Sequence, residues 1–200
     1  MAVKDKIKNR VRVAPKGKIF VLSDFASLGN YKTIQKQVNL LVQEGELRQL
    51  HRGIYQKPKY NELVQRPVPA SAEEIAAAYA RKNRWKISPA GELALNKLGL
   101  STQVPVQYHY VSSGPSKEIE LDNGRKITFR HVTQRESDMH PVSATVIEAL
   151  KTLGQENVSD KTIKKISSRL NDKQYEQLRK DSVNARSWIR DLINKMEAYR

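Results

Sequence analysis

Residues 24–55 read DFASLGNYKTIQKQVNLLVQEGELRQLHRGIY, and the pattern of this segment decides the fold. Between residues 30 and 43 the apolar residues recur at intervals of four, three and one, which places them on one side of an α-helix. These residues are Ile34, Val38, Leu41 and Val42. The opposite side carries Lys32, Lys36, Asn39 and Gln43 and no acidic group. Such side chains can donate hydrogen bonds to phosphates or base edges.

The residues around this helix predict a complete module. The apolar run at residues 25–28 predicts a short preceding helix, with Ser23 or Asp24 as its N-cap. Gly45 can adopt the left-handed conformation that ends the longer helix. From residue 47 to 55 the pattern alternates with period two around a glycine, which predicts a two-stranded ribbon. This is the plan of a winged helix-turn-helix, in which the second helix lies in a DNA groove.

A further helix and a strand precede the module. Apolar residues at i, i+4 and i+8 predict a helix over residues 3–14, which Pro15 and Gly17 end. The apolar run at residues 18–22 predicts a first strand that pairs with the ribbon. Basic residues surround the apolar stripe of the first helix, among them Lys8 and Arg12. These two either contact flanking phosphates or form a solvated face, and the pattern leaves both interpretations open.

The ribbon carries the other candidate contacts. An arginine at a ribbon tip can enter a minor groove, and Arg52 occupies that position. His51 is interpreted as a surface or neutral histidine rather than a catalyst, since no nucleophile or carboxylate stands beside it in sequence. Tyr55 is interpreted as a core or interface residue rather than a base-stacking one. The predicted DNA-binding residues are Lys8, Arg12, Lys32, Lys36, Asn39, Gln43, Arg48 and Arg52.

The positive charge is concentrated in the same part of the chain. The 200 residues carry a formal net charge of +15, and residues 1–60, with 13 Lys and Arg against 4 Asp and Glu, carry +9 of it. A basic patch binds a nucleic acid of any sequence by releasing counterions, and salt weakens this binding strongly. A membrane surface is the rival polyanion, but this end has no long basic amphipathic helix with exposed Trp or Phe.

Composition excludes several classes of protein. The hydrophobic fraction of 38% and the charged fraction of 28% are typical of a folded chain of one or two domains. The chain has no cysteine, which excludes disulfides and thiolate metal sites. No apolar run approaches the roughly 18 residues of a membrane span, and Met-Ala-Val-Lys-Asp-Lys at the N-terminus has no apolar signal-peptide centre. We therefore expect a cytoplasmic protein.

Prolines predict where the first domain ends. Lys57-Pro58-Lys59 and Arg66-Pro67-Val68-Pro69 interrupt helix and strand patterns on both sides of a short polar segment. The predicted organisation is a DNA-binding domain over residues 1–60, a linker over 61–70 and an α+β domain over 71–200. Residues 141–200 form a candidate subdomain within the last of these.

The predicted second domain mixes helices and strands. Ser71 and Glu74 have the capping-box spacing that starts a helix. A strand at residues 85–88 follows, and then a helix that begins at Pro89 and ends before Gly99. After this helix, apolar and polar residues alternate, which predicts the strands of a small antiparallel sheet.

This sheet is predicted as a meander over residues 104–132, with a hairpin at Asp122-Asn123-Gly124-Arg125. From Pro141 onward the apolar spacing returns to that of amphipathic helices, the second of them capped by Ser159 and the last running over residues 185–198. The predicted fold class is α+β: an N-terminal winged helix-turn-helix followed by an α+β domain with a small antiparallel sheet and terminal helices.

Motifs of the common enzyme classes are missing. The sequence has no GxxxxGK[ST], GxGxxG or HExxH motif and no Gly-Ser nucleophile elbow. The four histidines are scattered along the chain: His51, His109, His131 and His140. We therefore expect no enzyme, no metal and no cofactor. An enzyme acting on nucleic acid is kept as a third hypothesis, which requires carboxylates or histidines gathered in one cleft.

A series of short motifs runs through residues 1–150. In order, these are Lys6-Ile7-Lys8-Asn9-Arg10, Gly17-Lys18-Ile19-Phe20, Ser23-Asp24-Phe25, Leu41-Val42-Gln43-Glu44-Gly45, Arg52-Gly53-Ile54-Tyr55, Ser71-Ala72-Glu73-Glu74-Ile75-Ala76, Pro89-Ala90-Gly91 and Leu98-Gly99-Leu100-Ser101-Thr102-Gln103-Val104-Pro105. In this order they resemble the AbiEi-like antitoxins of type IV toxin–antitoxin systems. The Arg-Gly-Ile-Tyr motif and the last motif are the most specific of them.

The resemblance implies a prokaryotic antitoxin with an N-terminal winged helix and a C-terminal domain needed for antitoxicity. Such proteins bind repeats upstream of their operon, repress it and oppose a nucleotidyltransferase-like toxin without necessarily binding it stably. Carried over to this chain, the recognition helix is Tyr31 to Gln43 and the wing centres on Arg52 and Gly53. The resemblance assigns no antitoxic residues here.

Two functions of different class follow. The first is a sequence-specific DNA-binding repressor, the antitoxin of a type IV pair, that binds its own double-stranded operator as a monomer or weak dimer. The second is a protein-interaction module in which the winged helix is a scaffold and residues 141–200 dock a toxin or another protein.

Overall fold

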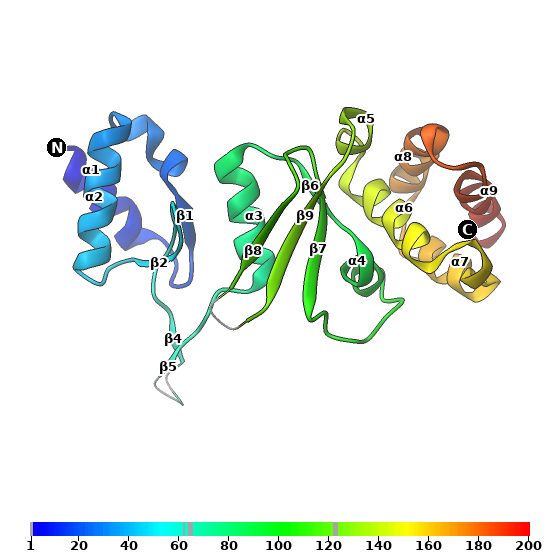
Figure 1. The fold of residues 1–200 in the computed structure, drawn as a ribbon, viewed down its shortest axis with the longest axis horizontal. Helices are drawn as coiled ribbons and strands as arrows, with labels where there is room; N and C mark the ends of the chain where they lie inside the picture. The colour runs from blue at the N-terminus through cyan, green and yellow to red at the C-terminus, as the bar shows by residue number, and fades with distance from the viewer. Residues whose placement is uncertain (1, 62, 64–65, 122–123) are drawn as a thin grey trace. The chain divides into compact units, whose positions relative to one another are not determined.

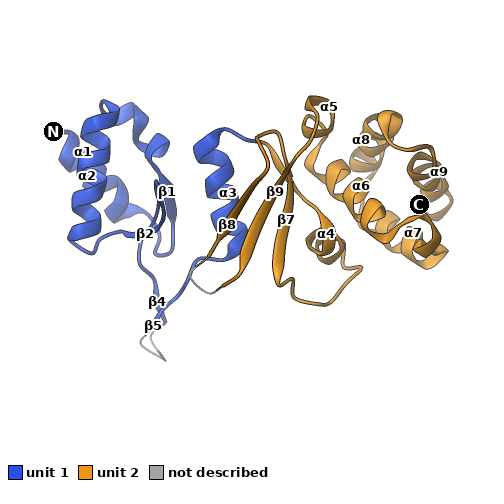
Figure 2. Ribbon diagram, in the orientation of Figure 1, with its two compact units in different colours: residues 1–85 blue, residues 86–200 orange. Residues whose placement is uncertain are grey.

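The computed structural model describes residues 2–61, 63, 66–121 and 124–200. The fold is mixed α+β, and the chain forms two compact units, residues 1–85 and residues 86–200 (Figures 1 and 2). The predicted hairpin turn at Asp122 and Asn123 lies outside the described residues.

Unit 1 combines helices with a three-stranded antiparallel sheet of order β1-β3-β2 and a short two-stranded ribbon, β4-β5 (Figure 1). Its elements are α1 Val3–Val13, β1 Ile19–Val21, the 3-10 helix η1 Leu22–Leu28, α2 Tyr31–Gln43, β2 Arg48–His51, β3 Ile54–Gln56, β4 Tyr60–Asn61, β5 Arg66–Pro67 and α3 Ala72–Asn83.

Helix α2 has the limits that the sequence predicts. The side chain of Asn30 accepts a 2.9 Å hydrogen bond from the backbone N–H of Thr33, which caps the start of the helix. Its end is followed by Gly45 at φ +73°, the left-handed conformation that glycine adopts without steric cost. The buried residues of α2 are Ile34, Val38 and Leu41.

The short preceding helix differs from its prediction in type and in cap. It is a 3-10 helix that begins at Leu22, so Val21 is the N-cap residue rather than Ser23 or Asp24. Asp24 is the third residue of the helix, and its carboxylate accepts a 2.9 Å hydrogen bond from the backbone N–H of Val21. The prediction of Ser23 or Asp24 as the N-cap residue is therefore wrong, because Asp24 lies within the helix.

The β2–β3 hairpin (residues 48–56) follows α2. Its turn contains Gly53 at φ +77°, and the register shifts between Gln49 and His51, as a bulge does. β3 lies in the middle of the sheet, paired with β1 on its other edge. One core joins α1, η1, α2 and this sheet, with the buried residues Ile7, Val11, Phe20, Phe25, Ile34, Val38, Leu41, Leu47 and Tyr55.

Helix α3 belongs to unit 1, which differs from the predicted domain limits. Ser71 caps it with the predicted capping box, but the helix contacts β1 and β3. The compact unit therefore runs to Trp85, whereas the sequence placed a boundary at residues 61–70. Prolines interrupt secondary structure locally, but the packing of a helix against a distant sheet determines the unit.

Unit 2 places a four-stranded sheet next to a group of helices (Figure 1). Its elements are β6 Ile87–Pro89, α4 Gly91–Lys97, β7 Gln107–Ser112, β8 Lys117–Glu120, β9 Lys126–His131, α5 Gln134–Ser137, α6 Pro141–Leu153, η2 Gln155–Asn157, α7 Asp160–Ser167, α8 Asp172–Asp181, η3 Ser182–Asn184, α9 Ser187–Lys195 and η4 Met196–Tyr199.

The sheet of unit 2 is mixed, so the predicted antiparallel meander is wrong. Its order is β6-β7-β9-β8, and β7 pairs with β9 in parallel. β9 takes an inner position because Ile127 and Phe129 are fully buried there. β8, with the charged sequence Lys-Glu-Ile-Glu, takes the edge, where charged side chains discourage further pairing.

Two predicted details at the start of unit 2 also change. Pro89 ends strand β6, opposite Tyr110, rather than opening α4, which begins at Gly91. This is an edge strand, where proline is tolerated because its missing N–H interrupts no inner ladder. Gly99 follows the end of α4 at φ +63°, as predicted.

The C-terminal helices share their core with α4, so residues 141–200 are not a separate compact unit. Helix α6 is buried along most of its length and contacts both α4 and β6. Ser159 caps α7 by accepting a hydrogen bond from Thr162, as predicted. The last predicted helix, residues 185–198, is shorter as an α-helix and continues as a 3-10 turn from Met196.

Candidate nucleic-acid interface

The outer face of α2 is polar and contains no carboxylate. All four predicted contact residues of this helix, Lys32, Lys36, Asn39 and Gln43, are exposed. Together with Gln35 and Leu40 they line a shallow depression of about 340 Å³. The buried residues of α2 lie on the other side, so core packing fixes which face the helix presents.

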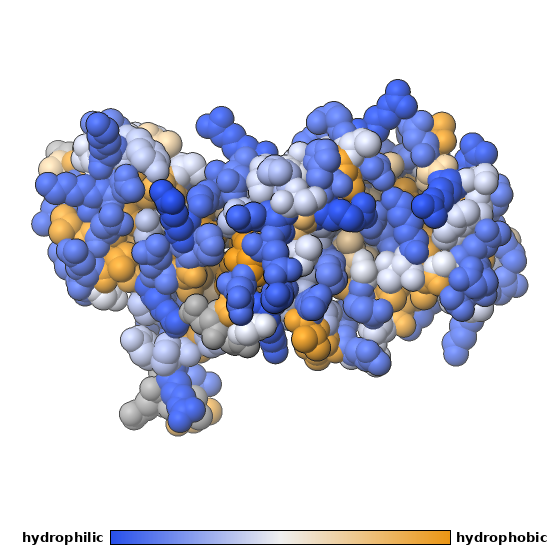
Figure 3. Space-filling model, in the orientation of Figure 1, coloured by the Kyte–Doolittle hydropathy of each residue, from blue (hydrophilic) through white to orange (hydrophobic). Residues whose placement is uncertain are grey.

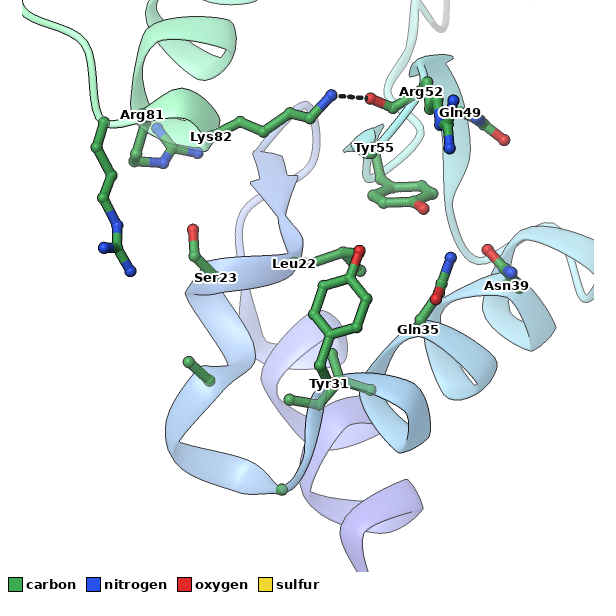
Figure 4. Close-up of a pocket in the computed structure, with 15 residues that line it drawn as sticks. Leu22, Ser23, Tyr31, Gln35, Asn39, Gln49, Arg52, Tyr55, Arg81 and Lys82 are labelled. Atoms are coloured by element: carbon green, nitrogen blue, oxygen red, sulfur yellow. Dashed lines mark hydrogen bonds between the residues drawn. The ribbon is translucent and has the colours of Figure 1, made fainter.

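The β2–β3 hairpin presents a second set of exposed cations. Arg48, at its start, and Arg52, in its turn, are both exposed. The backbone carbonyl of Arg52 accepts a 2.6 Å hydrogen bond from Nζ of Lys82, which lies in α3 (Figure 4). Helix α3 therefore holds the backbone of the turn, while the Arg52 side chain remains exposed.

A groove of about 740 Å³ lies between η1, α2, the β2–β3 hairpin and the end of α3 (Figure 4). None of the described residues that line it is an aspartate or a glutamate. Gln35 and Asn39 project into it from α2, and Gln49 and Arg52 border it from the hairpin. The complete lining is Leu22, Ser23, Ala26, Gly29, Tyr31, Ile34, Gln35, Asn39, Gln49, Arg52, Gly53, Tyr55, Arg81, Lys82 and Arg84.

Two tyrosines stand between the walls of this groove. Tyr31 is exposed at the start of α2, and Tyr55 is almost fully buried in β3. Burial raises the pKa of the Tyr55 phenol, and the neighbouring Tyr31 hydroxyl raises it further. Tyr55 also belongs to the core of unit 1, in agreement with its predicted role as a core or interface residue.

The three cations at the end of α3 are held differently. Arg81 donates 3.2 Å hydrogen bonds to the carbonyl of Ile19 and to the carboxylate of Asp24. Burial, and then the nearby guanidinium of Arg52, lower the pKa of Lys82. Arg84 is exposed and follows the helix at φ +58°.

The structure pairs Lys8 with two carboxylates. Its ammonium lies 2.7 Å from a carboxylate oxygen of Glu46 and 3.2 Å from one of Glu44. These hydrogen bonds raise the pKa of Lys8 and neutralise its charge locally. Arg12 is exposed on α1 and donates a 3.2 Å hydrogen bond to Asn9, while its backbone carbonyl accepts one from Lys57. Neither Lys8 nor Arg12 lines the groove.

Comparison with known proteins places the chain in a family. The model of the family of unknown function DUF6088 matches residues 6–178. The chain belongs to this family. The crystal structure of the RV2827C protein from Mycobacterium tuberculosis is similar at 11% sequence identity and a TM-score of 0.47, over 96% of this chain and 75% of that chain. The search of curated proteins gave no match.

In this DUF6088 protein, sequence reasoning missed the contribution of α3 and of two α2 residues. The helix that begins after Ser71 was assigned to the second domain, and no role was predicted for Arg81, Lys82 or Arg84, although the three cations around Asn83 stand together in the sequence. Tyr31 and Gln35 are exposed on the predicted recognition helix and complete its face. The i, i+4, i+8 spacing of Tyr31, Gln35 and Asn39 would have identified that face.

The visible face of each unit is mostly polar (Figure 3). Hydrophilic side chains cover most of the visible face of each unit, and exposed hydrophobic groups there are small and separate (Figure 3). Among the described residues, no three His, Cys, Asp or Glu side chains are grouped so that they could hold a metal ion. No helix in the described part of the chain is long and apolar enough to cross a membrane.

Proposed function

We propose that this DUF6088 protein is a sequence-specific DNA-binding transcriptional repressor whose unit 1 is a winged helix. In this proposal α2 is the recognition helix, and the β2–β3 hairpin is the wing. The observation that carries the proposal is the outer face of α2, which is exposed, rich in amides and lysines and free of carboxylates. Buried Ile34, Val38 and Leu41 fix this face outward, as a recognition helix requires.

The two kinds of side chain on α2 have different tasks. Asn39 and Gln43 carry amides, which can read the edge of an adenine through two hydrogen bonds. Lys32 and Lys36 carry charges, which position the helix on the phosphates without reading sequence. Arg52, at the tip of the wing, has the reach to enter a minor groove.

Charge supports DNA as the partner. Residues 1–85 contain 17 Lys and Arg against 7 Asp and Glu, a net charge of +10, and residues 86–200 carry the remaining +5. The acidic residues that the structure describes in unit 1 lie outside the groove lining and outside the face of α2. A positive surface attracts phosphates, and without carboxylates nearby no negative side chain repels them.

The second part of the proposal is the biological setting, an antitoxin of a type IV toxin–antitoxin system that represses its own operon and opposes a nucleotidyltransferase-like toxin. It rests on the motifs that resemble AbiEi-like antitoxins, from Lys6-Ile7-Lys8-Asn9-Arg10 to the segment ending at Pro105. The test is co-expression: the protein should restore growth of cells that express the toxin gene adjacent to its own. Growth arrest in spite of full-length, folded protein would remove this part and leave the repressor.

DNA binding is tested with a labelled duplex from the protein's own upstream region and a scrambled duplex of the same composition, across a salt series. A strong preference for the upstream duplex is expected. Asn39→Ala should reduce this preference, while Lys36→Ala should weaken binding to both duplexes and lower the salt slope by roughly 0.9. Equal binding of both duplexes by the unchanged protein would contradict a sequence-specific repressor.

The alternative function, a protein-interaction module that uses residues 141–200, stays a prediction. The terminal helices pack on α4 and β6 of the same unit, so the fragment to test is residues 86–200. Co-purification of a stoichiometric protein partner with this unit, together with absent DNA preference in unit 1, would favour the alternative.

A further inference from the structure

The groove between α2 and the β2–β3 hairpin has a third wall, which no helix-turn-helix pattern predicts. This wall is the end of α3, and it adds Arg81, Lys82 and Arg84 to Arg52 of the hairpin. The four cations border a space of about 740 Å³, and none of the described residues that line it carries a carboxylate. Arg81 is paired with Asp24, which lies outside the lining. A concave surface with one sign of charge concentrates ions of the opposite sign.

The cations of the third wall divide into two that organise the groove and one that faces outward. Arg81 ties α3 to the carbonyl of Ile19 and to Asp24, and Lys82 ties α3 to the hairpin turn. The guanidinium of Arg84 makes no hydrogen bond or ion pair with any residue that the structure describes, and it is exposed. Arg84 is therefore available to a ligand, while its two neighbours hold the walls together.

The backbone at Arg84 gives an independent indication. Its φ of +58° is the one left-handed value among the non-glycine residues that the structure describes. Glycine adopts this conformation without steric cost, and an L-residue adopts it at a cost, so strained residues are found disproportionately where the side chain has a function. The conformation also ends α3 at Arg84, beside the groove.

We infer that this groove holds the sugar–phosphate backbone of one DNA strand, with Arg84 as a phosphate contact opposite the recognition helix. The inference rests on the proposed function and extends the DNA interface to α3. The groove offers donors suited to phosphate oxygens, namely guanidinium groups, the side-chain amides of Gln35 and Gln49 and the hydroxyl of Tyr31. Because these contacts ignore the base sequence, Arg84 contributes affinity and register rather than specificity.

The first test measures the affinity of full-length Arg84→Ala protein for the upstream duplex and the scrambled duplex across a salt series. Loss of one phosphate contact should lower the salt slope by roughly 0.9 and weaken binding on the order of five- to tenfold at 0.1 M salt, equally for both duplexes. Lys16→Ala is the matched control, since Lys16 is an exposed cation of unit 1 that does not line this groove. Its slope and affinity should change less than those of Arg84→Ala.

The second test uses the absence of cysteine from the chain. Arg84→Cys and Lys16→Cys each introduce a single thiol into the full-length protein, whose alkylation by a maleimide is followed with and without the upstream duplex. DNA should protect the thiol at position 84 and leave the thiol at position 16 reactive. This readout reports proximity to DNA and does not depend on how much affinity the substitution removes.

The outcomes separate this inference from the proposed function. Unchanged affinity and slope for Arg84→Ala, with an unprotected thiol at position 84, would overturn the groove as a strand path if Asn39→Ala still lowers the upstream preference. Absence of any upstream preference in the unchanged protein would overturn the proposed repressor itself. A lower slope together with protection at position 84 would support both.

Discussion

The ammonium group of Lys82 in α3 donates a 2.6 Å hydrogen bond to the backbone carbonyl of Arg52 in the turn of the β2–β3 hairpin. Lys82 lies so close to this turn that a Cβ atom at Gly53 would be 3.2 Å from its Cε. Its ammonium also lies 5.4 Å from the ring centroid of Tyr79 on its own helix. The position of the proposed wing thus depends on a helix that follows it by about thirty residues.

Lys82→Met tests this dependence. Methionine keeps an apolar stem of similar length and removes the donor, so the carbonyl of Arg52 loses its partner. We expect the free energy of unfolding to fall by about 1 kcal/mol and the amides of residues 53–55 to exchange faster with deuterium. Faster exchange confined to the hairpin would show local release of the turn, whereas wild-type exchange rates there would contradict a holding role. Lys16→Met, at an exposed lysine of the same unit, serves as the control.

A sequence reveals local interactions better than packing between elements that are far apart in the chain. Helix α2 was predicted to its limits because its signals are local: Asn30 caps it, Gly45 ends it and its apolar spacing is regular. The packing of α3 against β1 and β3 was not predicted, since no local pattern records which distant sheet a helix covers. For the same reason the cations around Arg84 were assigned to another domain.

The sheet of unit 2 gives the same lesson for strands. The alternating patterns of β7 and β9 predicted strands in the correct places, but alternation does not determine which strands pair. β9 pairs in parallel with β7, and its Ile127 and Phe129 are buried at an inner position of the sheet. In the candidate site, the polar face of α2 was predictable from its sequence. The pairing of Lys8 with Glu44 and Glu46 was not predictable, because it depends on the approach of α1 to the end of α2.

Lys8→Ala and Lys36→Ala should differ in their effect on DNA binding. The charge of Lys8 is already neutralised by Glu44 and Glu46, so its removal should leave the salt slope unchanged. Lys36 is exposed on the acid-free face of α2, and its removal should lower the slope by roughly 0.9. Both are measured by the salt dependence of duplex binding. A lower salt slope for Lys8→Ala would show that α1 contacts DNA.

Tyr55 should make stability fall at alkaline pH. Burial raises the pKa of its phenol above the ordinary value of about 10, so the folded state retains a proton that the unfolded state releases. The stabilisation is therefore complete below about pH 10 and is lost as the pH rises through the folded-state pKa. Tyr55→Phe should show a shallower loss of stability above this pH, measured by urea unfolding at a series of pH values. The exposed Tyr60 gives the control, Tyr60→Phe, which should retain the steep decline.

A fragment of residues 1–85 should fold alone, and a fragment of residues 1–60 should not. The shorter fragment lacks α3, which contacts β1 and β3 and carries the buried residues Ile75, Ala76 and Tyr79. Exposing several apolar side chains costs roughly 1.5–3 kcal/mol for each large one, which approaches the whole stability of a small domain. Circular dichroism during thermal unfolding should show a cooperative transition for residues 1–85 alone. A cooperative transition of equal midpoint in residues 1–60 would restore the boundary predicted at 61–70.

Arg84→Gly should stabilise the protein and weaken DNA binding at once. Glycine relieves the steric cost of φ +58°, and after the greater freedom of glycine in the unfolded chain is counted, a gain of up to about 1 kcal/mol is expected. The same substitution removes the guanidinium that borders the groove, so affinity for the upstream and scrambled duplexes should fall together. Chemical unfolding and duplex binding of the same preparation measure the two effects. Arg84→Ala, which keeps a Cβ atom, separates them: it should lose the binding without the gain in stability. Improved stability with unchanged binding would mean that Arg84 ends α3 and does nothing for DNA, and the strand path would then have to lie along α2 and the β2–β3 hairpin alone.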